Sequence, residues 1–120
     1  MKKILLIVLV FIVGCAKEPI NMETLNERDD VFYTKDTNEP YTGAVFRLYE
    51  SGEKMVEAYL KDGKPDGKWT SYFEDGQIQY EGSHKDGEKD GKWTKYNDDG
   101  SVDEMREFKD GAWVDRDKYQ

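Results

Sequence analysis

A glycine repeat with a period of 24 residues constrains the fold of this 120-residue chain more than any other feature. Three glycine series keep this interval in a common register: Gly43, Gly67 and Gly91; Gly52, Gly76 and Gly100; Gly63, Gly87 and Gly111. A fixed period of this size is typical of stacked-repeat architectures, in which each unit packs on its neighbours. The glycines define three units, at residues 43–66, 67–90 and 91–114.

Each unit is expected to contain two strands. Residues 67–74 are rich in aromatic and β-forming residues, and Asp75-Gly76 follows them. Asp-Gly between such runs indicates a β-hairpin, because glycine adopts positive φ without steric cost. A longer turn is expected between Asp86 and Gly91. The repeat therefore predicts an all-β fold, an antiparallel β-meander of hairpin repeats in one elongated, twisted sheet.

A two-residue turn at Asp75-Gly76 also predicts the strand register. The expected pairs are Trp69 with Gly82, Ser71 with Tyr80, Phe73 with Ile78, and, one period away, Trp93 with Arg106, Asn97 with Val102, Val45 with Ala58 and Tyr49 with Lys54. We expect the Trp69 indole to lie flat over Gly82, where no side chain stands. Trp93 is expected to form a cation–π contact with Arg106.

The N-terminus resembles a bacterial lipoprotein signal peptide, residues 1–14. Two lysines precede the ten-residue apolar block Ile4–Val13, whereas a membrane-spanning helix needs roughly 20 apolar residues. Ile12-Val13-Gly14-Cys15 resembles the lipobox of bacterial lipoproteins. The resemblance implies cleavage before Cys15, lipidation of Cys15 and a lipid-anchored place on a cell-envelope membrane, the outer membrane in a Gram-negative cell.

The remaining segments follow from local composition. Residues 15–30 are mostly polar and lack a sustained hydrophobic period, so we expect a flexible tether between a signal helix and the repeats. Residues 31–42 are expected to form a capping strand and its turn. The repeat domain then covers residues 31–114, and a C-terminal tail covers residues 115–120.

Composition excludes several classes of function. The net charge is −8, and removal of Lys2 and Lys3 with the leader would make it more negative by two, so the chain lacks the basic footprint of a nucleic-acid binder. One cysteine and one histidine exclude a disulfide framework and a Cys/His zinc site. Aromatic residues make up 13% of the chain, which argues against plain disorder.

Two segments could suggest chemistry. Asp86-x-Glu88-x-Asp90-Gly91 resembles the opening of an EF-hand calcium loop, but its twelfth position is Asn97 and turn chemistry already explains the Asp and Gly residues. The single histidine, His84, is equivalent to Leu60 and Phe108 in the other units, which predicts a packing position. The sequence therefore predicts no enzyme, no cofactor and no metal site.

The repeats resemble a known family. Tyr80-Glu81-Gly82, Gly87 and Asp90-Gly91-Lys92-Trp93 resemble the MORN repeat. Gly-Lys-Trp-Thr-x-Tyr followed by Asp-Gly, at residues 67–76 and 91–100, is similar to repeats of the YwqK-type family, which is labelled as a toxin–antitoxin antitoxin family. The resemblance covers residues 31–114 and implies binding and neutralisation of a partner protein. Ala58 and Arg106 depart from it, because the MORN pattern has glycine there.

Two functions remain open from the sequence. The first is a non-catalytic, membrane-anchored lipoprotein that binds a protein partner through one sheet face, with the candidate contact residues Trp69, Phe73, Tyr80, Trp93 and Arg106. The alternative is an envelope protein that binds a small ligand or a cation such as calcium through its acidic turns.

Overall fold

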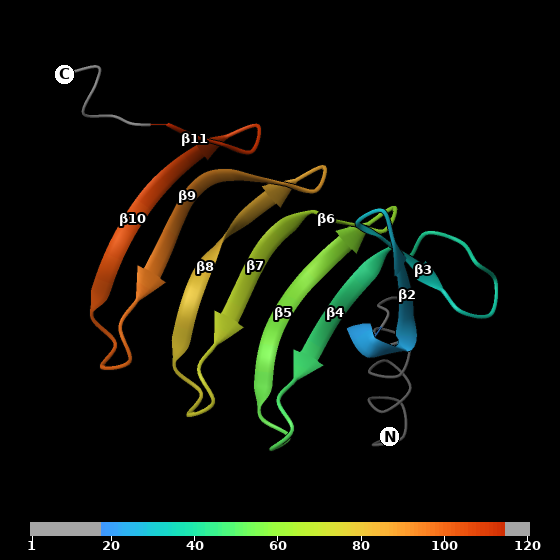
Figure 1. Cartoon of the computed structure of the whole chain (residues 1–120), viewed down its shortest axis with the longest axis horizontal. Coiled ribbons are helices and arrows are strands. Elements are labelled where there is room, and N and C mark those ends of the chain that lie inside the picture. Colours follow the sequence, from blue (N-terminus) through green and yellow to red (C-terminus); the bar gives the residue numbers. More distant parts are fainter. Residues whose placement is uncertain (1–17, 115–120) are drawn as a thin grey trace, which may run out of the picture.

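The computed structural model describes residues 18–114, which form a nearly all-β protein (Figure 1). The main sheet has nine strands in the order β1-β4-β5-β7-β8-β9-β10-β11, with β6 paired to β5. Its strands are β1 (Ile20–Asn21), β4 (Gly43–Leu48), β5 (Lys54–Lys61), β6 (Lys64–Pro65), β7 (Gly67–Tyr72), β8 (Ile78–Lys85), β9 (Glu88–Tyr96), β10 (Val102–Lys109) and β11 (Ala112–Val114). The pairing of β1 with β4 is parallel and the other pairings are antiparallel, so the predicted antiparallel meander is confirmed.

Each 24-residue unit supplies one hairpin, as the sequence predicts. The hairpins are β4–β5, β7–β8 and β9–β10, and each lies beside the next in Figure 1. All nine repeat glycines adopt positive φ, which explains why glycine recurs at these positions. The sheet therefore grows by one hairpin per unit, and each strand contacts its neighbours along the chain.

The two kinds of turn are interchanged relative to the sequence prediction. Asp86-Gly87 joins β8 directly to β9, and its φ values of 51° and 87° are those of a two-residue type I′ turn. Asp75-Gly76 instead lies in a three-residue loop, in which the Phe73 N–H donates to the Gln77 carbonyl at 2.8 Å and only the glycine has positive φ. Asp-Gly suits both loops because each loop needs positive φ at its last residue, which is the glycine.

The predicted register is confirmed away from the three-residue loops and is wrong beside them. Trp69 pairs with Gly82, Ser71 with Tyr80, Val45 with Ala58, and Trp93 with Arg106. Next to the loops, Ile78 pairs with Tyr72, Val102 with Tyr96, and Lys54 with Leu48, in place of Phe73, Asn97 and Tyr49. The third loop residue creates a bulge, which shifts each of these pairings by one residue.

The N-terminal segment folds over the first hairpin. Residues 20–28 form β1, the 3₁₀ turn η1 (Met22–Thr24) and β2 (Leu25–Arg28), and β2 pairs with β3 (Val31–Thr34) in a separate two-stranded sheet. Met22, Leu25 and Phe32 are buried against Val45 and Leu60, and these five side chains form the hydrophobic core. We call residues 20–34 the cap.

The predicted flexible tether is therefore wrong for residues 20–28. Met22 and Leu25 look isolated among polar neighbours in the sequence, but the 3₁₀ turn between them directs both side chains into the core. The predicted capping strand is found at β3, where the Phe32 N–H donates to the Gly63 carbonyl at 2.8 Å. Burial of three apolar side chains offsets the entropy of ordering this short segment.

The predictions for the signal helix, Cys15 and the C-terminal tail concern residues 1–17 and 115–120, which lie outside the described part of the chain. Within residues 18–114, no helix has the length and hydrophobicity that crossing a membrane requires.

Candidate functional site

One side of the sheet carries a continuous row of rings. Trp69 on β7 contacts His84 on β8 with ring centroids 5.1 Å apart, and His84 contacts Trp93 on β9 at 5.0 Å, both edge to face. The row continues to Phe108 on β10 and its cross-strand partner Trp113 on β11. We call the side that carries these five rings the tryptophan face.

The cap covers the tryptophan face over the first unit only. Val45 and Leu60 occupy the positions that Trp69 and His84 occupy in the second unit, and they are 2% and 0% exposed beneath the cap. Over the second and third units, no described segment takes the place of the cap. Trp113 is 54% exposed and Tyr80 is 36% exposed, whereas Trp93, packed on Gly82 and His84, is only 7% exposed.

His84 packs between two indoles, as its equivalence to Leu60 and Phe108 predicts. Burial lowers the pKa of His84, and the nearby Lys89 ammonium lowers it further. Nδ1 of His84 is buried and has no hydrogen-bond partner among the described residues. Packing between the two indoles therefore favours the neutral form of this imidazole.

Gly82 is covered by Trp93 rather than by Trp69, which corrects the sequence prediction. A Cβ atom placed on Gly82 would lie 2.2 Å from Cδ2 of Trp93. The Trp93 indole also donates from Nε1 to the Ser83 carbonyl at 2.9 Å. The covering ring comes from β9, because a bulge between Glu81 and Ser83 leaves Gly82 beside that strand.

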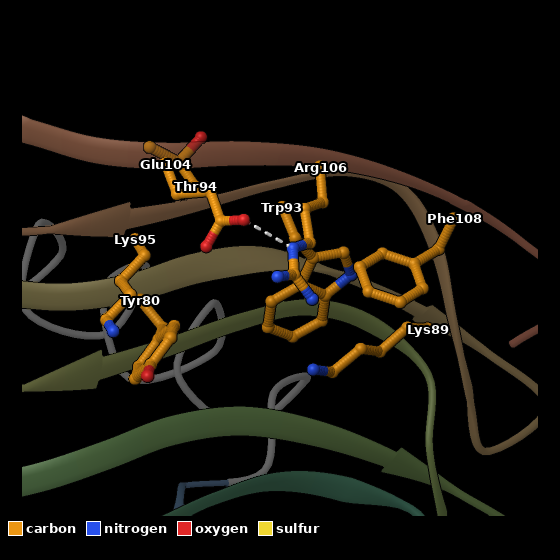
Figure 2. A pocket seen from close by; sticks show the side chains of 8 residues that line it. All are labelled: Tyr80, Lys89, Trp93, Thr94, Lys95, Glu104, Arg106 and Phe108. Carbon is orange, nitrogen blue, oxygen red and sulfur yellow. Dashed lines mark hydrogen bonds and ion pairs between the residues drawn. The ribbon is translucent and has the colours of Figure 1, made fainter. Parts of the chain in front are cut away.

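A shallow hollow of about 270 Å³ opens beside Trp93, between β8, β9 and β10 (Figure 2). It is lined by Tyr80, Lys89, Trp93, Thr94, Lys95, Glu104, Arg106 and Phe108. In the view of Figure 2, Tyr80 and Lys95 stand at one end of the hollow and Phe108 stands at the other. Aromatic and cationic groups thus share one small depression.

The cations of this region pair with rings and carboxylates. The Lys89 ammonium lies 4.9 Å from the Trp93 ring centroid and 5.1 Å from that of Phe108. The cation recorded over Trp93 is thus Lys89, and not Arg106 as the sequence predicts. The Arg106 guanidinium lies 4.2 Å from the Trp113 ring centroid and donates to Glu104 at 2.6 Å. Trp113 takes this contact because it is a diagonal neighbour of Arg106 on the same face.

The five residues predicted to contact a partner separate into two groups. Tyr80, Trp93 and Arg106 line the hollow, and Trp69 joins the same face through His84. Phe73 lies elsewhere, in a second depression at the loop end of the sheet, lined also by Gln79 and Asn97. The three-residue loop removes it from the tryptophan face.

Sequence reasoning missed Lys89, Lys95 and Trp113 at this site. Trp113 follows the last complete hairpin, but it occupies the repeat position of Lys89, and that equivalence could have placed it on the same face. Lys95 stands two residues after Trp93 on β9, and strand alternation puts both on one side.

The reverse side of the sheet carries a ladder of tyrosine–glutamate hydrogen bonds. The Tyr72 hydroxyl donates to Glu57 at 2.5 Å, and one period later Tyr96 donates to Glu81 at 2.6 Å. The hydrogen bond to Glu57, together with burial, raises the pKa of Tyr72 to about 12. Hydrogen bonds from Lys54 and Tyr72 lower the pKa of Glu57. These side chains are mutually satisfied, so we assign the ladder to stability.

The acidic turns do not form a metal centre in the described region. Between residues 18 and 114, no group of three or more His, Cys, Asp or Glu residues is arranged to hold a metal ion. The Asp86 to Gly91 segment that resembles an EF-hand loop is a type I′ turn continuing into β9. The calcium alternative therefore has no candidate site among these residues.

The fold and this face define a class of protein: an antiparallel repeat sheet, capped at one end, with an aromatic face that the cap covers over the first unit only. A family model described as a MORN repeat variant matches residues 65–86 and 89–110, which contain the second and third hairpins almost entirely. Within these two segments the chain is similar to that repeat variant. No curated protein and no solved structure matches the chain significantly.

Proposed function

We propose that the protein is a lipid-anchored, non-catalytic module that holds a protein partner on its tryptophan face at the cell envelope. The observation that carries this proposal is the exposure of Trp113 and Tyr80 on the part of the tryptophan face that the cap leaves uncovered. MORN repeats often serve as protein- or membrane-binding modules. Exposed aromatic patches next to polar groups are typical of interaction sites.

A protein partner fits this face better than an anionic membrane surface. The chain carries 26 acidic and 18 basic residues, so only the cationic hollow, and not the molecule around it, would attract anionic head groups. The hollow of about 270 Å³ lies below the roughly 300–1,000 Å³ of pockets that enclose small ligands. It is better suited to one inserted side chain. A partner held inactive by such binding would agree with the antitoxin label of the resembling family.

Membrane attachment is tested by the substitution Cys15→Ser. The proposal expects the wild-type chain in the membrane fraction and the variant in the soluble fraction, because the thioether-linked acyl chains would be lost. Fractionation followed by immunoblotting measures this. Cys15→Ser protein that stays membrane-bound at the wild-type level would contradict the lipid anchor.

Partner binding is tested by crosslinking from envelope membranes, with Trp113→Ala and Tyr80→Ala. Both side chains are exposed on the tryptophan face, so their truncation removes contact area and leaves the core intact. Each is expected to weaken capture by about 2 kcal/mol if it is a hot spot. Tyr59→Ala is the matched control, because Tyr59 is 43% exposed and pairs with Ala44 on the reverse side. Equal capture by all three variants would refute docking on this face.

A further inference from the structure

The lining of the hollow is mainly cationic, whereas the chain as a whole is acidic. Its lining contains three cations, Lys89, Lys95 and Arg106, and one carboxylate, Glu104, although acidic residues outnumber basic ones in the whole chain. Lys89 makes no ion pair with any residue between 18 and 114, and its recorded contacts are with rings. A local positive potential on an acidic molecule directs carboxylates to one place.

The third hairpin, β9–β10, carries these cations at positions where the preceding period lacks them. Lys89 replaces the Pro65 of the preceding period, Lys95 replaces Ser71, and Arg106 replaces Gly82. The turn glycines that support the fold do not change between these units. The repeat fold therefore does not require these charges, although the first unit also has a cation, Arg47, at the position equivalent to Lys95.

Two carboxylates of the chain itself pair with cations of the hollow: Glu104, which lines it, and Asp103, which lies in the neighbouring depression. Glu104 accepts a hydrogen bond from Nε of Arg106 at 2.6 Å, and Asp103 lies 3.6 Å from the Lys95 ammonium. Both pairs are nearly half exposed, so neither is a strong internal ion pair, and a carboxylate from another molecule can replace or join them. Tyr80 and Phe108 stand at the two ends of the hollow. Their rings could contact an apolar side chain next to such a carboxylate in the partner.

We propose that the partner presents a short acidic segment with an apolar anchor residue, and that this segment docks in the hollow. Its carboxylates lie against Lys89, Lys95 and Arg106, and the anchor side chain inserts beside Trp93. The inference rests on the proposed function and specifies the chemistry of the partner. It commits to an acidic peptide because the three cations complement one.

The test uses the full-length chain in non-ionic detergent and three synthetic peptides. The probe is acetyl-Gly-Glu-Glu-Phe-Glu-Glu-Gly-amide, and its comparison peptides have Gln or Lys in place of every Glu. Binding is followed by NMR through the indole N–H signals of the three tryptophans. We expect the acidic peptide to shift the Trp93 and Trp113 signals saturably and the Trp69 signal less. The Gln peptide is expected to bind about tenfold more weakly, and high salt should weaken binding of the acidic peptide.

Charge-reversal variants complete the test. Lys89→Glu and Lys95→Glu should each weaken binding of the acidic peptide severalfold. Lys61→Glu makes the same charge change at an exposed position outside the hollow and should leave binding close to wild type. A folded spectrum for each variant excludes loss of structure as the cause.

Several results would overturn the inference: no binding of the acidic peptide, equal binding of the Gln or Lys peptide, or an equal effect of Lys61→Glu. The proposed function fails separately. If Trp113→Ala and Tyr80→Ala abolish partner capture while the peptides show no charge preference, the face docks a protein but not an acidic one. If neither substitution affects capture, docking on this face is itself wrong.

Discussion

The packing of Trp93 on Gly82 yields a prediction with a definite size. Gly82→Ala adds a Cβ atom that would lie 2.2 Å from Cδ2 and 2.4 Å from Cε2 of the indole. Carbon atoms pack best at about 3.5–4.0 Å, so the ring must move by more than about 1 Å. That movement would also lengthen the 2.9 Å hydrogen bond from Nε1 of Trp93 to the Ser83 carbonyl.

The expected cost of Gly82→Ala follows from three terms. Overpacking costs about 1–3 kcal/mol, and the weakened hydrogen bond costs about 0.5–1.5 kcal/mol. Gly82 does not have positive φ, so alanine fits the backbone and recovers about 0.4–1 kcal/mol from the unfolded state. We therefore expect the free energy of unfolding to fall by about 2 kcal/mol and Tm to fall by about 10 °C.

The assay is urea denaturation followed by circular dichroism, with Trp93→Leu as a second background. Leucine removes the indole that the new methyl group meets, so Gly82→Ala should become neutral or stabilising there. This change of sign separates a clash with the ring from a general intolerance of alanine in β8. A neutral effect in the wild-type background, or the same cost in both backgrounds, would refute the assigned packing.

Two further predictions concern pH. Because His84 has a pKa lowered from 6.5, the unfolded state takes up its proton first, and stability should fall as the pH drops below about 6.5; His84→Phe, which copies the equivalent Phe108, should flatten stability between pH 7 and about 5.5 in urea titrations. An unchanged pH profile in that variant would contradict the assignment. Tyr72→Phe should cost about 1 kcal/mol at pH 7, because it removes the 2.5 Å hydrogen bond to the half-exposed Glu57 carboxylate. Wild-type stability should also fall as the pH rises from 10 toward 12, because Tyr72 loses its proton near pH 10 when unfolded and near pH 12 when folded. Tyr72→Phe should reduce that loss without abolishing it, because the pKa values of Tyr41 and Tyr96 are raised as well.

The repeat itself was predictable because glycine spacing and strand alternation are local properties. The 24-residue period fixes three hairpins, and alternation then gives the pairs Trp69–Gly82 and Trp93–Arg106. The interchange of the two Asp-Gly turns was not predictable from these signals. Both loop types accept the dipeptide. The length of the loop, two or three residues, depends on the register in which the two strands pair along their full length.

The cap and the site depend on contacts between distant residues, which the pattern does not encode. Met22 and Leu25 are two apolar residues in a polar segment. They become buried only by packing against Val45 and Leu60 of the first hairpin. Trp93 covers Gly82 because of a bulge in the β8–β9 pairing. The register within one hairpin does not predict how that hairpin pairs with the next one.

The sheet is covered by the cap at one end and ends in the uncovered strand β11 at the other, so its local stability should differ between the two ends. Every hydrophobic member of the core cluster lies in the cap or the first hairpin, whereas the last strand has three residues and a largely exposed tryptophan. In a linear array, each hairpin contacts only its neighbours. Local unfolding should therefore start at the C-terminal edge and reach the capped first hairpin last. Amide protons of β4 and β5 should therefore exchange with solvent last, and a ligand held near the third hairpin would slow exchange where the molecule is weakest.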